Sequence, residues 1–220
     1  KVQWSVAGKN AATADLASAN AYASVDHNGV VTGKKIGNAT IVAVYQGQKI
    51  KRKLHIAGKK KIALDAGHQS RGDSRKEPVG PGSSVRKARV AGGATGVASR
   101  VPEYKFTLSV AKRLQKELKK RGYEVYMVRT KNNVNISNKK RAMLANKSGA
   151  DIYIRIHADS SNSRAVTGAS GLYPSKANRY VSKLSAKSKK LSSCLLKSYC
   201  KKTKIRNRGL VARDDLTGTN

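Results

Sequence analysis

The chain has 220 residues, of which 46 are Lys or Arg and 12 are Asp or Glu, so its formal net charge is +34. No uninterrupted apolar run approaches the roughly 18 residues that a membrane-spanning helix needs, and we expect no transmembrane segment. The chain starts Lys-Val-Gln-Trp, without an initiator Met or the apolar segment of an export signal. We therefore expect any such signal to have been removed or to lie outside these residues.

The positive charge is concentrated in the second part of the chain. Residues 1–57 contain 8 basic and 2 acidic side chains, whereas residues 58–220 contain 38 and 10. Between Ser160 and Arg213 there are 14 Lys or Arg and no Asp or Glu. Such a surface is expected to attract polyanions, and a solvated charged face that only keeps the protein in solution is the simpler alternative.

The composition also bears on which polyanion is expected. The chain has one Phe, one Trp, no zinc-finger spacing and no basic-zipper heptads, so nucleic acid is the less favoured partner. Anionic polymers of a bacterial cell wall fit the charge without needing base-stacking side chains.

Two cysteines are too few for a disulfide scaffold. If the segment between Cys194 and Cys200 is helical, they are about 9 Å apart, which is too far for a bridge. We predict two free, buried thiols.

The first 57 residues have the pattern of an all-β module. Short β-rich segments alternate with turn residues such as His27-Asn28-Gly29 and Gln46-Gly47. The predicted strands are Trp4–Val6, Ala23–Val25, Val30–Thr32, Thr40–Tyr45 and Ile50–Ile56. The segments 2–5, 23–33 and 37–43 resemble bacterial immunoglobulin-like (group 2) domains. The resemblance implies a small sandwich that is only partial here, since its first strands would lie upstream of Lys1.

From residue 58 onwards the pattern changes, and strands alternate with amphipathic helices. The predicted strands are Ile62–Leu64, Glu124–Arg129 and Ile152–Ile156, and the predicted helices are 104–121, 137–148 and 178–201, with Ser137 as an N-cap. This order predicts an α/β fold: an open, twisted, mostly parallel sheet with helices on both faces. The Gly-rich loop from Gln69 to Arg100 is expected to border a groove.

Three potential metal ligands are expected at one edge of that sheet. His68 follows the first α/β strand, and His157 follows the third. Because parallel strands end at the same edge, both imidazoles are expected there, where open α/β sheets bind ligands. Glu103 precedes the first helix, which starts at that edge. On its own, each histidine is more simply a structural residue and Glu103 a carboxylate that favours the helix dipole.

Two imidazoles and one carboxylate, with a fourth position left to water, form a ligand set used for catalytic zinc. The spacing of the three residues along the chain does not identify the metal. The convergence of three separate segments is what favours a site made of His68, Glu103 and His157.

The same segments resemble the zinc-dependent N-acetylmuramoyl-L-alanine amidases of the amidase-3 type, over roughly residues 61–210. The matching motifs, in order, are Asp65-Ala66-Gly67-His68, Glu103, Gly122-Tyr123-Glu124-Val125, Val128-Arg129-Thr130, Arg141, Ala145-Asn146 and the run from Gly149 to Ala158. The resemblance implies that His68, Glu103 and His157 hold Zn²⁺. It also implies a secreted cell-wall enzyme that cleaves peptidoglycan between muramic acid and the first L-alanine of the stem peptide.

This sequence departs from the family in three places. The family's general-base Glu, in a late strand after a Pro, has no counterpart, and neither Asp214 nor Asp215 matches it. The catalytic residue is therefore unassigned, the domain 58–220 is expected to lack its C-terminal strand, and we expect zinc binding with little turnover. Arg155 stands where the family usually has a small residue, and Asp159 stands where it often has Asn. Arg155 is expected on the sheet face opposite Ile154, either partly exposed or in contact with substrate.

A metal-bound imidazole usually needs a partner on its other nitrogen. Asp159, Asp65 or a backbone carbonyl would each serve.

Two other functions stay open: a non-catalytic protein that binds cell-wall polyanions on an amidase-like scaffold, and a related zinc aminopeptidase or carboxypeptidase. The peptidase alternative is disfavoured because such sites often use additional Asp or Glu ligands, and the sequence shows no candidates for them.

Overall fold

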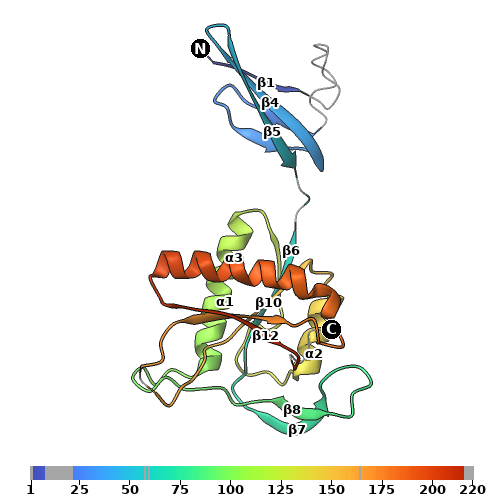
Figure 1. The fold of residues 1–220 in the computed structure, drawn as a ribbon, viewed down its shortest axis with the longest axis vertical. Helices are drawn as coiled ribbons and strands as arrows, with labels where there is room; N and C mark the ends of the chain where they lie inside the picture. The colour runs from blue at the N-terminus through green and yellow to red at the C-terminus, as the bar shows by residue number, and fades with distance from the viewer. Residues whose placement is uncertain (1, 8–21, 57, 59, 164, 216–220) are drawn as a thin grey trace. The chain divides into compact units, whose positions relative to one another are not determined.

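A computed structural model describes residues 2–7, 22–56, 58, 60–163 and 165–215 (Figure 1). The chain divides into two compact units, Lys1–Lys59 and Lys60–Asn220, which are described separately. Parts of the segment that joins the two predicted domains, residues 57 and 59, lie outside the described residues.

The first unit contains strands at all five predicted places. They are β1 (Gln3–Ala7), β2 (Ala23–Val25), β3 (Val31–Gly33), β4 (Gly37–Tyr45) and β5 (Gln48–Ile56). The antiparallel sheet has the order β1-β4-β5, and β2 pairs with β3. Gln46 and Gly47 both have positive φ, as a two-residue turn between paired strands requires. The core is formed by Val6, Ala23, Ala39 and Ile41, with Trp4 packed against it.

A parallel sheet forms the centre of the second unit. Its strands are β6 (Lys61–Ala66), β9 (Glu124–Met127) and β10 (Ile152–Ile156), in the order β10-β6-β9. The predicted strand Glu124–Arg129 therefore ends two residues early. Val128 still donates its N–H to Leu64, but Arg129 turns inward to bind backbone carbonyls near the end of β6.

Helices α1 (Glu103–Lys120) and α2 (Asn138–Lys147) cover opposite faces of this sheet. Successive strand residues point to opposite faces. Ala66 of β6 therefore packs with Leu108 and Ala111 of α1, whereas Ala63 packs with Ala145 of α2. The predicted N-cap of α2 is confirmed, because the hydroxyl of Ser137 accepts the N–H of Lys140.

The long loop after β6 contains an antiparallel hairpin of β7 (Asp73–Pro78) and β8 (Arg86–Val90). This hairpin was not predicted from the sequence. The hairpin has no apolar alternation for a sequence pattern to detect. Instead, the carboxylate of Asp73 pairs with Arg75 of its own strand and Arg89 of the other.

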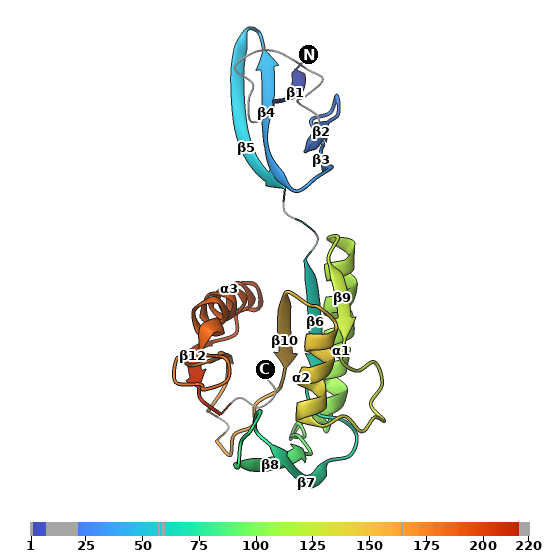
Figure 2. The ribbon, with the colours of Figure 1, turned by 90° about the vertical axis from the view of Figure 1, so that its right-hand side faces the viewer.

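The last part of the chain forms a second, two-stranded parallel sheet of β11 (Ala169–Pro174) and β12 (Asn207–Arg213), which was not predicted. A 3₁₀ turn, η1 (Ser182–Leu184), leads into α3 (Ser185–Thr203). This helix packs on β11 and β12 (Figure 2). It begins later than predicted because the buried Asn178 instead accepts the N–H groups of Tyr180 and Val181 in a turn.

Both cysteines lie on α3 as free thiols. Cys194 is exposed and Cys200 is half-buried, so the prediction that both are buried was wrong. Among the helices of the described residues, none combines the length and apolar character needed to cross a membrane.

Candidate metal centre

His68, Glu103 and His157 meet at the carboxyl edge of the parallel sheet. Nε2 of His68 lies 3.1 Å from Nδ1 of His157. The carboxylate of Glu103 presents one oxygen to each ring, at 3.2 Å from His68 Nε2 and 3.0 Å from His157 Nδ1. In the described part of the chain, this is the only group of three or more His, Cys, Asp or Glu side chains within metal-binding reach of one another.

The three side chains come from the ends of three elements. His68 follows β6, Glu103 is the first residue of α1, and His157 directly follows β10. Glycines make room for the rings: a Cβ at Gly67 would lie 2.5 Å from Cε1 of His157, and one at Gly93 would lie 2.9 Å from Cγ of His68. The site therefore depends on backbone that carries no side chain at these two positions.

The tautomer of His68 is set by the hydrogen bond that its Nδ1 makes. Nδ1 lies 2.8 Å from the carbonyl oxygen of Ala91, which can only accept a hydrogen bond. Nδ1 therefore carries the proton, and Nε2 directs its lone pair toward Glu103 and His157. Of the three kinds of partner considered from the sequence, the structure places a backbone carbonyl against His68.

Glu103 is buried, with 5% of its surface exposed. Burial alone would raise the pKa of its carboxyl group, but the N–H groups of Ala94 and Ala158 and the nearby His68 outweigh this effect and lower the pKa. Glu103 is therefore held as a carboxylate, the form that binds a cation.

The electrostatics around His157 favour a neutral ring. Burial, the guanidinium of Arg155 and the neighbouring His68 lower the pKa of His157, and Glu103 opposes them only in part. A neutral imidazole is the form that coordinates a metal.

The three side chains are close enough together to hold one metal ion. Tetrahedral zinc with bonds of about 2.0–2.1 Å separates neighbouring ligand atoms by about 3.3 Å. Here the two ring nitrogens are 3.1 Å apart and face different oxygens of Glu103, at 3.2 and 3.0 Å. One ligand atom from each residue lies within 4.8 Å of the others. Two lone-pair nitrogens and one carboxylate at these distances match the donor chemistry of such a site.

Asp65, expected near the site, lies in a buried ion network on the α2 face of the sheet. Its carboxylate binds the guanidinium of Arg141, accepts the hydroxyl of Tyr153 at 2.7 Å and lies 3.0 Å from Nε of Arg155. Arg155 thus lies on the face opposite Ile154, with 21% of its side chain exposed. Asp159 has a side chain 78% exposed and lies 3.3 Å from Arg208.

Two buried arginines hold the backbone that carries the ligands. Arg129 donates to the carbonyls of Ala66, Gly67 and Tyr104, which adjoin His68 and Glu103 along the chain. Arg141 donates to the carbonyl of His68 itself. That residue has a φ of 58°, a left-handed conformation that is uncommon outside glycine. Both arginines occur in the sequence motifs, but nothing in the sequence indicates what they bind.

Two imidazoles and a carboxylate at the edge of a parallel sheet define an α/β protein with a candidate three-ligand metal centre. A family model described as Amidase_3, N-acetylmuramoyl-L-alanine amidase, matches residues 62–219. The chain therefore belongs to this peptidoglycan amidase family. A comparison with curated proteins gave no match.

Solved structures of such amidases have the same fold. One is the N-acetylmuramoyl-L-alanine amidase from Clostridium difficile 630, with 26% identity, a TM-score of 0.54 and 73% of each chain covered. Ami1 from Mycobacterium smegmatis has 23% identity and a TM-score of 0.62, over 73% of this chain and 76% of that one. The catalytic domain of CwlV from Bacillus (Paenibacillus) polymyxa var. colistinus has 23% identity and a TM-score of 0.53, over 73% and 72%.

A methyl group at Gly67 should disturb the site without replacing any of the three candidate ligand residues. In Gly67→Ala the new Cβ would collide with the ring of His157 and the carbonyl of Ile156. We expect zinc affinity, measured by competition with a chromophoric chelator, to fall about 10-fold to 100-fold, as for other residues that support ligands. Gly92→Ala is the control, since a Cβ there meets nothing within 4 Å. Equal affinities in the two variants would contradict the proposed packing.

Arg129 should be a major source of stability for the second unit. Arg129→Met removes the buried guanidinium that donates to the carbonyls of Ala66, Gly67 and Tyr104, and we expect a loss of about 3 kcal/mol in the free energy of unfolding, measured by urea denaturation. The exposed Arg113 of α1 provides the control Arg113→Met, expected to change stability by less than about 0.5 kcal/mol. A loss below about 1 kcal/mol for Arg129→Met would show that the network contributes little.

Proposed function

We propose that the second unit is a zinc-dependent amidase that hydrolyses the bond between N-acetylmuramic acid and the first L-alanine of the stem peptide. The observation that carries this proposal is the convergence of His68, Glu103 and His157, whose ligand atoms lie within 4.8 Å of one another, in a chain of this amidase family. A bound zinc ion would supply a Lewis acid that polarises the amide carbonyl and lowers the pKa of water.

The chain's own residues would hold and orient this chemistry. Glu103 is kept ionised by two backbone N–H groups, and the carbonyl of Ala91 fixes the proton of His68 on the nitrogen that faces away. The side chain of His157 is 43% exposed, so one side of the group is open for substrate to approach.

Three further proposals rest on the sequence alone. We propose that the first unit is a partial immunoglobulin-like (group 2) module that acts as a spacer or wall-targeting unit, and that the protein is secreted to the cell wall. Anionic cell-wall polymers are the proposed further partners. The alternative is a binding protein without catalysis, which would need no zinc.

Zinc analysis separates the amidase from this alternative. We expect about one equivalent of zinc per chain by mass spectrometry and a higher melting temperature on adding zinc, because a ligand that binds only the folded state stabilises it. His157→Ala should lose both, and His27→Ala in the first unit should keep both. A protein that binds no zinc and shows no thermal shift would favour the non-catalytic alternative.

Turnover is a separate prediction. No acidic residue of the 220 stands in the context of the family's general-base Glu. Since a general base typically contributes about 10² to 10⁴-fold, we expect zinc-loaded protein of this sequence to release L-alanyl peptides from muropeptides very slowly. Rapid release, measured by mass spectrometry, would show that another residue or the metal alone is sufficient for catalysis.

A further inference from the structure

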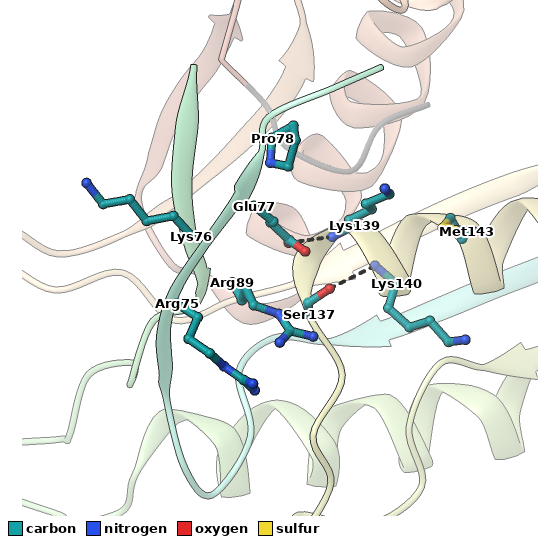
Figure 3. Close-up of a pocket in the computed structure, with 9 residues that line it drawn as sticks. All are labelled: Arg75, Lys76, Glu77, Pro78, Arg89, Ser137, Lys139, Lys140 and Met143. Carbon is teal, nitrogen blue, oxygen red and sulfur yellow. Dashed lines mark hydrogen bonds between the residues drawn. The ribbon is translucent and has the colours of Figure 1, made fainter. Parts of the chain in front are cut away.

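A pocket separate from the three ligand residues lies between the β7–β8 hairpin and the start of α2. Its volume is about 470 Å³ (Figure 3). Five of the side chains that line it are cationic: Arg75, Lys76, Arg89, Lys139 and Lys140. The lining contains one carboxylate, Glu77, and no aromatic side chain.

The cations of the pocket are only partly neutralised. Asp73 pairs with Arg75 at 2.8 Å and with Arg89 at 3.3 Å. Within the described residues, neither Lys139 nor Lys140 forms an ion pair with a carboxylate. Counting Glu77 and Asp73 against the five cations leaves an excess of three positive charges around one cavity.

The two lysines also lie where a helix disfavours them. Lys139 and Lys140 are in the first turn of α2, which contains no acidic residue, and the helix dipole makes that end positive. The backbone there is already capped, because Ser137 accepts the N–H of Lys140 and Glu77 accepts that of Lys139 (Figure 3). The helix end is thus not itself the binding group, and the side chains of the lysines remain available to a ligand.

We propose that this pocket binds phosphate groups of a phosphodiester polymer that carries no bases. The five cations are spread along the hairpin and the start of α2 (Figure 3), so successive phosphates of one polymer can contact several Lys and Arg side chains at once, which a single small anion cannot do. Nucleic acid is disfavoured because single-stranded nucleic acid binding uses aromatic platforms, which this lining lacks. The site lies outside the ligand group and does not depend on the amidase activity.

The test compares two double variants with the same change in net charge. Lys139→Gln with Lys140→Gln removes two pocket cations, and it should fold because it removes positive charge from the first turn of a helix. Lys112→Gln with Lys147→Gln removes two exposed lysines that do not line the pocket. Each protein is titrated, with EDTA present, with fluorescently labelled glycerol phosphate oligomers, and with polyglutamate and single-stranded DNA of equal charge number.

We expect the pocket variant to bind the glycerol phosphate oligomer about tenfold more weakly than the unsubstituted protein, and the control variant to change by less than about threefold. Unsubstituted protein should bind this oligomer more tightly than polyglutamate or DNA. Equal losses in the two variants would show that net charge alone attracts the polymer and would overturn the proposal. Equal binding of polyglutamate would overturn the preference for phosphate, and tighter, pocket-dependent binding of DNA would assign the site to nucleic acid. Because EDTA removes zinc from every sample, this test does not depend on the proposed hydrolysis.

Discussion

Two buried guanidinium groups fix the geometry on which the candidate centre depends. Arg129 and Arg141 are 2% and 0% exposed, and together they bind the carbonyls of Ala66, Gly67 and His68. Arg129 also binds the carbonyl of Tyr104, next to Glu103. The end of β6 and the start of α1 are thereby held together, and two candidate metal ligands that are 35 positions apart in the sequence are set side by side.

This arrangement carries an electrostatic cost. Burial, followed by the neighbouring Arg141, lowers the pKa of Arg129 to about 10, so the side chain stays charged at neutral pH. Asp65 is the buried carboxylate that balances the pair, and burial together with that carboxylate raises the pKa of Tyr153 and keeps its hydroxyl a donor. A buried charge is tolerated only when it is paired and hydrogen-bonded, and the carbonyls around β6 meet that requirement. The same contacts that stabilise the charges therefore preorganise the ligands.

The parts of this fold that could be predicted from the sequence are those in which apolar residues repeat with the period of a helix or a strand. The apolar repeats of α1 and of β10 indicated a parallel sheet, and the rule that parallel strands end at one edge was enough to bring together His68, Glu103 and His157. The β7–β8 hairpin was missed because ion pairs join its strands and leave no apolar alternation, and the β11–β12 pair has a register shift between Ala169 and Gly171. The partner of His68 could not be foreseen either, since the carbonyl of Ala91 follows from the path of the hairpin and not from residue type.

The central claim is that one zinc ion is held by these two imidazoles and one carboxylate. X-ray absorption spectroscopy of the zinc-loaded protein tests it directly, because it reports the identity and distance of the atoms bound to the metal. The account predicts two imidazole nitrogens and carboxylate oxygen at about 2.0–2.2 Å. A sulfur neighbour at about 2.3 Å, or a shell with fewer than two imidazoles, would contradict it.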